Sequence, residues 1–470
     1  MLFFLPVLCI GWVLRSRPTL YKYFLIAASL VFYGNLGMEY LLLLLTIAGL
    51  NWGSAVSLKK TVGIALKRLI VTADVTVHVM ILAFFKYAEP FFLWLNDTLG
   101  TDGSLQQWIM ESGAADVILP AGLSFYSFQG LSYVIDHFRN PERPARSFAD
   151  VLAYVSFFPT IMAGPIMRET DFFPQLEAQQ GNRTDFNEGM AFILSGLFKK
   201  VALATFLSEH LVDPFFRDPE NYSSTAALVG IYAYSIQIFL DFSGYSDLAI
   251  GIGRLMGFRL PQNFDSPYRA LNLQEFWHRW HISLSRWLRD YLYIPLGGNR
   301  RGNRYVNLTV TMVIGGIWHG SGLNFLIWGF FHGIGLAFVH LFGQIKRKIA
   351  TNDASQGQGK ALWRVLSWLL TFNFVTLLWV FFRAKDFDGA CRVLQSVTHS
   401  HEGTAYPVQV LLIMALGLLM QWIGPACFRS FAAFQEKLPW SLQAVVVGIL
   451  GGLILNLGPE GVLPFIYFNF

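Results

Sequence analysis

The sequence predicts an all-α protein that crosses a membrane many times. Hydrophobic residues make up 54% of its 470 residues and charged residues only 14%, and the mean hydropathy is +0.44. Apolar runs of about 18 to 22 residues, long enough to cross roughly 30 Å of hydrocarbon as helices, recur along the whole chain. We therefore expect one integral-membrane domain over residues 1–470, with about 10–12 spanning helices.

Cysteine usage and net charge argue against two other classes of site. Cys9, Cys391 and Cys427 are far apart and show neither CxxC nor metal-ligand spacing, so we expect no disulfide framework and no metal site. The formal net charge of +5 comes from basic residues spread over short loops between apolar runs. This distribution is typical of the positive-inside rule for membrane proteins, and it argues against nucleic-acid binding.

The first apolar run, MLFFLPVLCIGWVL, is expected to be a retained helix and not a cleaved signal peptide. Its basic residues, Arg15, Arg17 and Lys22, follow the run instead of preceding it. The other expected apolar helices outside the central stretch are Tyr23–Gly37, Tyr40–Val56, Leu69–Leu95, Val117–Phe138, Gly189–Leu211, Thr225–Asp241, Leu362–Phe382, Val408–Trp422 and Leu442–Leu457.

Three segments carry features that a lipid-facing helix avoids. Val117–Phe138 contains several serines, Gln129 and Asp136, so it should face protein or a wet cavity. Val151–Met167 is interrupted by prolines at 159 and 165, which predicts a broken or re-entrant helix that lines a cavity. Gly189–Leu211 holds adjacent lysines at 199 and 200, whose ammonium groups we expect to snorkel to the membrane interface.

The segment Phe242–Gly257 is rich in small residues. Glycines at positions 244, 251, 253 and 257 predict close approach of another helix. Asp241 and Asp247 are six residues apart, about 240° around a helix, so they should not face one another. Catalysis by paired carboxylates is therefore not favoured.

The motif Trp318-His319-Gly320 lies between two apolar runs, Val306–Ile317 and Leu323–Leu341. Basic residues before the first run and after the second predict a hairpin that begins and ends in the cytoplasm. Twelve to fourteen helical residues rise about 20 Å, which keeps His319 within the hydrocarbon layer.

A histidine at that depth has two interpretations. It can act as a general base, because its unperturbed pKa is near neutrality, or it can be a buried structural residue bonded to a carbonyl. Glycines at 315, 316, 320 and 322 flank His319, and we expect them to leave space for a ligand beside the ring. This favours the functional interpretation.

The stretch Gln274–Tyr293 fits one amphipathic helix, with Arg279, Arg286 and Arg289 on a common part of its surface. Such a helix can lie in the membrane interface. Alternatively, its arginines can receive the phosphates of a cytoplasmic cosubstrate, because guanidinium fits phosphate geometry. The residues leave both interpretations open. The sequence has no Walker GxxxxGK[ST], HExxH or GxSxG motif.

Several of these stretches together resemble the membrane-bound O-acyltransferase superfamily, in its bacterial polysaccharide O-acetylation branch. They span most of the chain in the expected order. The matching stretches are LPAGLSFYSFQGLSYVIDHFR (119 to 139), FFPTIMAGPI (157 to 166), DFSGYSDLAIGIGRLMGF (241 to 258), EFWHRWHISLSRWLRDYLYIPLGGNR (275 to 300) and GGIWHG (315 to 320).

The resemblance implies a ring of transmembrane helices around a central tunnel that reaches a catalytic histidine, with the catalytic core in about residues 117–342. The family's catalytic histidine falls on His319 and a second family histidine on His281. The sequence departs from the family at His278, where FWRRWH commonly has arginine, which weakens a phosphate-binding role for that position. His278 and His332 are expected to be structural.

The resemblance also implies a mechanism. His319 would act as general base, or pass the acyl group directly, when an acceptor hydroxyl attacks the donor thioester. His281 and Asn324 would orient the ring or stabilise the developing oxyanion. The expected substrate-binding residues are Asn324, Trp318, Arg279, Arg286 and Arg289.

The predicted activity is transfer of an acetyl group from a cytoplasmic thioester, acetyl-CoA, to an exported polysaccharide such as alginate or cellulose, with no bound cofactor. One alternative is D-alanyl transfer from a carrier-protein thioester to teichoic acid. Another is a transporter or flippase, although no pair of interrupted helices in two halves supports it. The expected location is the bacterial inner membrane, and the expected partners are membrane lipids, the acyl donor or its carrier protein, a periplasmic acetyltransferase and polysaccharide-export proteins.

Overall fold

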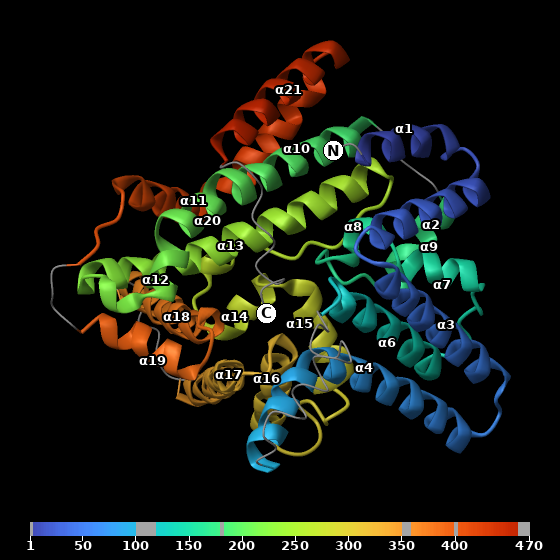
Figure 1. Ribbon diagram of the computed structural model, residues 1–470, viewed down its shortest axis with the longest axis horizontal. Helices are drawn as coiled ribbons and strands as arrows, with labels where there is room; N and C mark the ends of the chain where they lie inside the picture. The colour runs from blue at the N-terminus through green and yellow to red at the C-terminus, as the bar shows by residue number, and fades with distance from the viewer. Residues whose placement is uncertain (1–2, 100–118, 179–182, 350–358, 399–402, 459–470) are drawn as a thin grey trace. The chain divides into compact units, whose positions relative to one another are not determined.

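The computed structural model describes residues 3–99, 119–178, 183–349, 359–398 and 403–458, and their regular structure is helical apart from one β-bridge between Tyr222 and Thr404 (Figure 1). The prediction of an all-α, multi-pass membrane protein is confirmed. By length and composition, eight helical stretches in the described residues can cross a membrane: Met38–Lys60, Ile64–Ala88, Asp185–Arg217, Ser224–Leu255, Leu323–Gly343, Ala361–Arg383, Val408–Lys437 and Trp440–Leu457. This number is below the expected 10–12 because other apolar helices are shorter.

The described chain divides into two compact units. The first comprises residues 1–186 and 252–261, and the second comprises residues 187–251 and 262–470. The single domain expected from the sequence stays a prediction. The helices that begin in the first unit are α1 (Phe4–Leu14), α2 (Pro18–Gly34), α3 (Met38–Lys60), α4 (Ile64–Leu99), α6 (Leu123–Arg139), α7 (Phe148–Val155), α8 (Phe158–Ile161), α9 (Glu169–Ala178) and α10 (Arg183–Leu197).

The second unit carries the predicted site. Its remaining segments are η2 (Phe198–Ala204), α11 (Thr205–Leu207), η3 (Ser208–Val212), α12 (Asp213–Arg217), η4 (Pro219–Asn221), α13 (Ser224–Leu255), η5 (Pro267–Arg269), α14 (Leu273–Arg279), α15 (Ile282–Leu288), η6 (Arg289–Tyr293), α16 (Arg304–His319), α17 (Leu323–Ile349), α18 (Gly359–Arg383), α19 (Phe387–Ser396), α20 (Val408–Lys437) and α21 (Trp440–Leu457).

Two predictions for the first unit are confirmed, except that the cavity expected beside the proline-interrupted segment stays a prediction. The polar side chains of α6 are buried within the protein, including Ser127, Gln129 and Ser132, as expected for a helix that does not face lipid. The proline-interrupted segment is broken: α7 ends at Val155 and α8 begins at Phe158.

Helices α10 and α13 approach closely in the second unit. A Cβ atom at Gly244 would lie 3.0 Å from the carbonyl oxygen of Gly196, and one at Gly251 would lie 2.7 Å from that of Gly189. This confirms close packing at two of the predicted small residues.

The lysine pair after α10 does not snorkel. The Lys199 ammonium bonds the carboxylate of Asp247 at 2.7 Å, and Lys200, only 5% exposed, bonds Asp241. The snorkelling prediction is wrong because two carboxylates of α13 neutralise the two ammonium groups inside the protein. The aspartates do not face one another, as expected, since each pairs with a different lysine.

The prediction of a single amphipathic helix over Gln274–Tyr293 is also wrong, because the segment does not form one continuous helix. It is broken between α14 and α15 at His281, whose φ of +41° lies in the left-handed region. Asn263, fully buried, holds the break: its carbonyl accepts from the Ile282 amide at 3.0 Å, and its side-chain oxygen accepts from the Ser283 amide at 3.2 Å and hydroxyl at 2.7 Å. Tertiary hydrogen bonds thus override the helical pattern.

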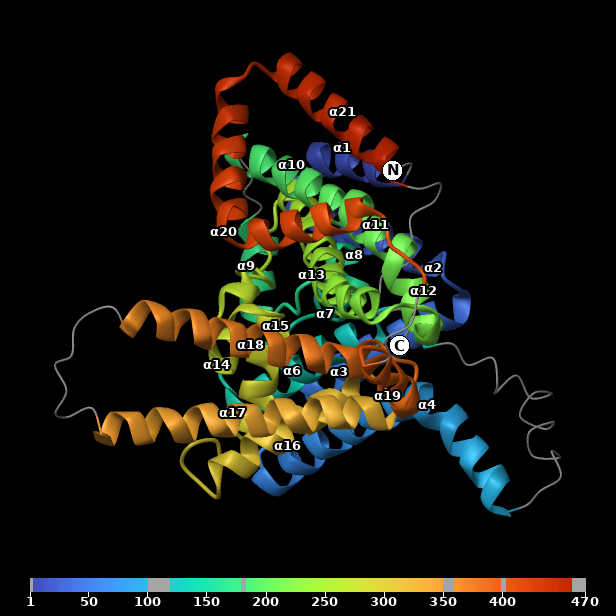
Figure 2. The ribbon, with the colours of Figure 1, turned by 90° about the vertical axis from the view of Figure 1, so that its left-hand side faces the viewer.

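The hairpin of α16 and α17 is confirmed, and the two helices lie side by side in both ribbon views (Figures 1 and 2). Three glycines remove the side chains that would separate the backbones. A Cβ atom at Gly316 would overlap the Phe325 carbonyl, one at Gly329 would overlap the Met312 carbonyl, and one at Gly333 would lie 2.5 Å from Cα of Thr309. His319 is the last residue of α16.

Candidate active site

His319 lies in an aromatic enclosure at the end of the hairpin. Its side chain is almost fully buried, with 6% of the residue exposed. Its ring centroid lies 4.6 Å from that of Trp318, 5.2 Å from Trp328 on α17 and 4.9 Å from Phe382 on α18. These rings fix the orientation of the imidazole.

The glycines around His319 do not share one role. A Cβ atom at Gly320 would overlap the Phe325 ring, and one at Gly322 would overlap the Asn324 side chain, so these positions allow tight packing, as Gly316 does. At Gly315, by contrast, a Cβ atom would meet only Leu288, at an ordinary 3.4 Å. The expectation that all four leave space for a ligand is therefore wrong for three of them.

Asn324 stabilises the end of α18 instead of facing an oxyanion. Its side-chain nitrogen donates to the carbonyls of Phe381 at 3.0 Å and Ala384 at 2.9 Å. A primary amide has two hydrogens to donate, and both are engaged. The predicted oxyanion contact is thus wrong for its nitrogen, because only the side-chain oxygen, an acceptor, remains for a ligand.

His281 is buried against α13. It is 1% exposed, and its ring meets the Phe242 ring edge-on with centroids 4.6 Å apart. Burial lowers the pKa of His281 to about 3, so the ring is neutral at physiological pH. Its participation in catalysis stays a prediction.

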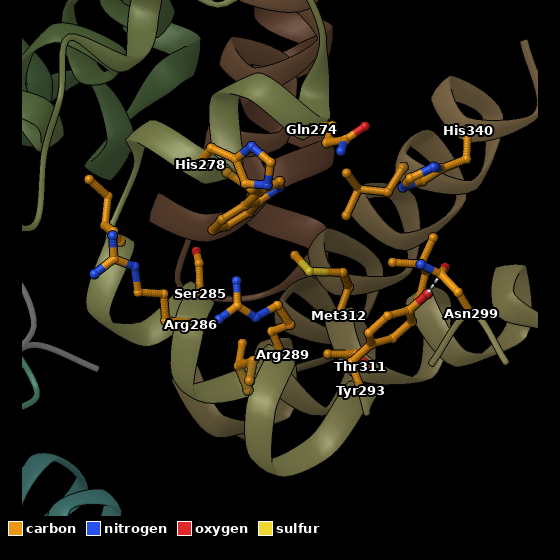
Figure 3. A pocket seen from close by; sticks show the side chains of 15 residues that line it. Gln274, His278, Ser285, Arg286, Arg289, Tyr293, Asn299, Thr311, Met312 and His340 are labelled. Carbon is orange, nitrogen blue, oxygen red and sulfur yellow. Dashed lines mark hydrogen bonds between the residues drawn. The ribbon is translucent and has the colours of Figure 1, made fainter. Parts of the chain in front are cut away.

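A cavity of about 420 Å³ opens beside the broken helix (Figure 3). In Figure 3 the imidazoles of His278 and His340 lie on two sides of it, with the guanidinium of Arg289 below them. No carboxylate lines it among the described residues, which suits an anionic ligand. The lining residues are Gln274, Trp277, His278, Ile282, Ser285, Arg286, Leu288, Arg289, Tyr293, Asn299, Leu308, Thr311, Met312, Leu336 and His340.

A second cavity of about 670 Å³ shares three lining residues with the first: Arg289, Tyr293 and Asn299. The Tyr293 hydroxyl donates to the Asn299 side chain at 2.7 Å, shown dashed in Figure 3. Arg300 and Arg301 complete its basic border. The two cavities together can take an elongated molecule with anionic groups at one end.

The three predicted phosphate-binding arginines separate in the structure. Arg286 and Arg289 line the first cavity, and Arg289 also pairs with its neighbour Asp290. Arg279 does not line it, because its guanidinium is held by Glu275 at 3.0 Å and Asp265 at 3.3 Å. The break at His281 separates Arg279 from the other two, so a common arginine surface does not form.

One face of α16 leads from the cavity to His319. Met312 lines the cavity, Gly315 is three residues further, and His319 follows four residues later, which is the spacing of one helix face. Gly315 is buried on this face, and a Cβ atom there would meet only the Leu288 side chain, at an ordinary contact distance of 3.4 Å. This face of α16, which carries no side chain at Gly315, thus links the lining of the cavity to His319.

The sequence patterns did not identify the residues that enclose the site. Trp328 and Phe382 contact the His319 ring, and Trp277 lines the cavity. In sequence they occur at the spacing of ordinary apolar helix positions, so only their size distinguished them. No three metal-ligating side chains gather in the described part of the chain.

Residues 72–382, which include His281 and His319, match the sequence profile of the membrane-bound O-acyltransferase family (MBOAT). The chain is 36% identical to a peptidoglycan O-acetyltransferase of Helicobacter pylori, over 84% of this chain and 77% of the relative. It is 33% identical to a probable alginate O-acetylase, AlgI, of Pseudomonas putida, over 99% of this chain and 98% of the relative. It is 25% identical to a teichoic acid D-alanyltransferase of Bacillus subtilis, over 57% of this chain and 69% of the relative.

Neighbouring glycines of α16 should respond differently to the same change. Gly316→Ala places a methyl group on the Phe325 carbonyl and forces the hairpin apart, which should cost about 1–3 kcal/mol of stability. Gly315→Ala should leave stability unchanged or slightly raised, because alanine favours helix. Thermal unfolding of both purified variants in one detergent checks this, and equal losses would contradict the close packing at Gly316.

The stability of the protein should depend on His281 in mild acid. Between pH 6.5 and about 3 the unfolded chain binds a proton that folded His281 does not. This contribution is complete above pH 6.5 and is lost as the pH falls, by about 1.4 kcal/mol per pH unit. His281→Asn, which tolerates the left-handed backbone, should therefore lose less stability than wild type between pH 7 and 4 in denaturant unfolding. A variant as acid-sensitive as wild type would contradict this.

Proposed function

This chain belongs to the membrane-bound O-acyltransferase family and is an acyltransferase, and on that premise we propose that it transfers an acetyl group from acetyl-CoA to hydroxyl groups of an exported polysaccharide. The observation that carries the proposal is the cavity that Arg286 and Arg289 line, which has no carboxylate among its described lining residues and is linked by one face of α16 to His319. Phosphates of the donor bind at Arg286 and Arg289, and the thioester end extends past Gly315.

In the proposed reaction, His319 takes the proton of an acceptor hydroxyl while the hydroxyl oxygen forms a bond to the acetyl carbon. The carbon–sulfur bond breaks, and its electron pair leaves on the sulfur. The thiolate then takes up the proton held by His319, which restores the neutral imidazole. The aromatic rings around His319 support this role because they exclude water that would hydrolyse the thioester.

The names of the similar proteins support the proposed acceptor. Among the similar proteins are enzymes named for alginate and peptidoglycan, both carbohydrate polymers, and this supports a polysaccharide acceptor. The chain is a multi-pass membrane protein, and we propose the bacterial inner membrane as its location. A periplasmic acetyltransferase and polysaccharide-export proteins are the proposed partners there.

A second candidate is D-alanyl transfer from a carrier protein to teichoic acid, which the similarity to the Bacillus subtilis enzyme favours. The arginine- and tryptophan-bearing segment of α14 and α15 would then dock the carrier protein. The relatives with acetyl transfer in their names cover more of the chain, so acetyl transfer is preferred.

Purified protein in liposomes, given labelled acetyl-CoA and candidate polysaccharides, tests the function. We expect label in the polysaccharide, and its loss in His319→Ala because the general base is gone. Transfer that requires a D-alanyl-loaded carrier would support the second candidate. Unchanged acetylation by a folded His319→Ala protein would overturn the assignment of His319.

Two arginines from the same segment test the donor site. Arg286→Ala should raise the KM for acetyl-CoA about tenfold, the loss of one charge-assisted phosphate contact. Arg279→Ala should leave the KM unchanged, because its carboxylate partners hold it outside the cavity. The KM of each variant for acetyl-CoA is measured from initial rates. An equal change of KM in the two variants would contradict the proposed donor site.

A further inference from the structure

His332 is a buried histidine beside the site that the mechanism has not used. It lies on α17, four residues after Trp328, and is fully buried. Its ring centroid is 4.8 Å from that of Trp328 and 5.1 Å from that of Trp277 on α14. Trp328 thus contacts both His319 and His332.

The hydrogen bond from Trp277 assigns the tautomer of His332. The indole Nε1–H of Trp277 donates to Nδ1 of His332 at 3.4 Å. An indole nitrogen can only donate, so Nδ1 is the acceptor, and in the neutral ring the proton stands on Nε2. The structure therefore presents an imidazole N–H of fixed orientation inside the membrane.

That N–H has no hydrogen-bond partner in the described part of the chain. Leaving a buried N–H unbonded is costly, and the ring that carries this one is connected to His319 through the ring of Trp328. Phenylalanine would fill the same space between Trp277 and Trp328 without that cost. A purely structural role thus explains the Nδ1 contact and leaves Nε2 unexplained.

His332 also has neighbours at both the first cavity, where the donor is proposed to bind, and His319. Trp277 lines the cavity, and so does Leu336, one helical turn after His332 on α17. On the other side, Trp328 connects His332 to His319 through ring contacts. A thioester lying along Trp328, with its acyl carbon beside His319, would have its sulfur on the side of His332.

We propose that Nε2–H of His332 is a catalytic hydrogen-bond donor to the thioester of the acyl donor. This inference rests on the proposed function and adds to it a residue that stabilises the thioester as its thiolate leaves. In the step, the acceptor oxygen bonds to the acyl carbon, its proton goes to His319, and the carbon–sulfur electron pair moves onto sulfur. His332 transfers no proton; its N–H stabilises the negative charge that develops on the thioester. The thiolate finally takes the proton from His319.

The test compares His332→Phe with His332→Gln. Phenylalanine keeps the ring and removes the donor, whereas the glutamine amide restores an N–H at a similar reach. With acetyl-CoA, His332→Phe should lower kcat about 100-fold with little change in KM, because the contact matters when charge develops. The kcat of His332→Gln should be at least tenfold higher than that of His332→Phe.

Two further variants separate catalysis from packing. Phe374→Leu alters a ring 6.0 Å from His332 without removing a donor, so it should lower thermal stability and leave kcat within about threefold of wild type. Trp277→Phe removes the N–H that fixes the tautomer, and its effect on kcat should be less than additive with that of His332→Phe.

The outcomes are distinguishable. If wild type acetylates the polysaccharide and His332→Phe does so at the same kcat, this inference fails while the proposed function stands. If His332→Phe and His332→Gln lose kcat equally, or lose it only in parallel with thermal stability and acetyl-CoA binding, the role is structural and the inference also fails. If wild type transfers no acyl group from acetyl-CoA or a loaded carrier, the proposed function itself fails.

Discussion

The close packing of α16 against α17 is the constraint on which the site depends. At Gly316, Gly329 and Gly333 the two helices approach so closely that a methyl group would meet backbone atoms of the other helix. In a membrane, where apolar side chains gain little by leaving lipid, such contacts are a main source of helix association. They hold His319 at a fixed place between Trp328 and Phe382, and they set the position of α17, on which the Trp328 ring contacts those of both His319 and His332.

The placement of charged side chains also determines where an anionic ligand can bind. Inside the second unit, Lys199 and Lys200 are neutralised by Asp247 and Asp241, so these ammonium groups do not attract an anionic ligand. At the cavity the opposite holds, since arginines and histidines line it and no described carboxylate does. Arg279, in the same segment, is held outside the cavity by two carboxylates, whereas Arg289 lines the cavity although it pairs with its neighbour Asp290. An anionic donor is thus directed to one place.

Much of this arrangement could be predicted from the sequence, because it follows from local patterns. Apolar run lengths predicted the membrane helices, and loop charges predicted the hairpin that carries the WHG motif. The failures came from tertiary contacts that no local pattern contains. The break at His281 depends on hydrogen bonds that Asn263, nearly twenty residues earlier, accepts. Flanking glycines look alike in sequence, yet a Cβ atom at Gly315 would meet only Leu288 at an ordinary 3.4 Å, whereas one at Gly316, Gly320 or Gly322 would overlap a neighbour. Similarly, the fixed tautomer of His332 depends on Trp277, a residue of another helix.

The most direct measurement is an experimental structure of the protein in lipid with a thioether analogue of acetyl-CoA that cannot transfer its acyl group. We predict that the phosphates lie beside Arg286 and Arg289 and that the chain passes over Gly315. The carbonyl end should lie between His319 and His332, within hydrogen-bond distance of Nε2 of His332. An analogue bound with this cavity empty, or one that reaches His319 by another route, would contradict the proposed donor path.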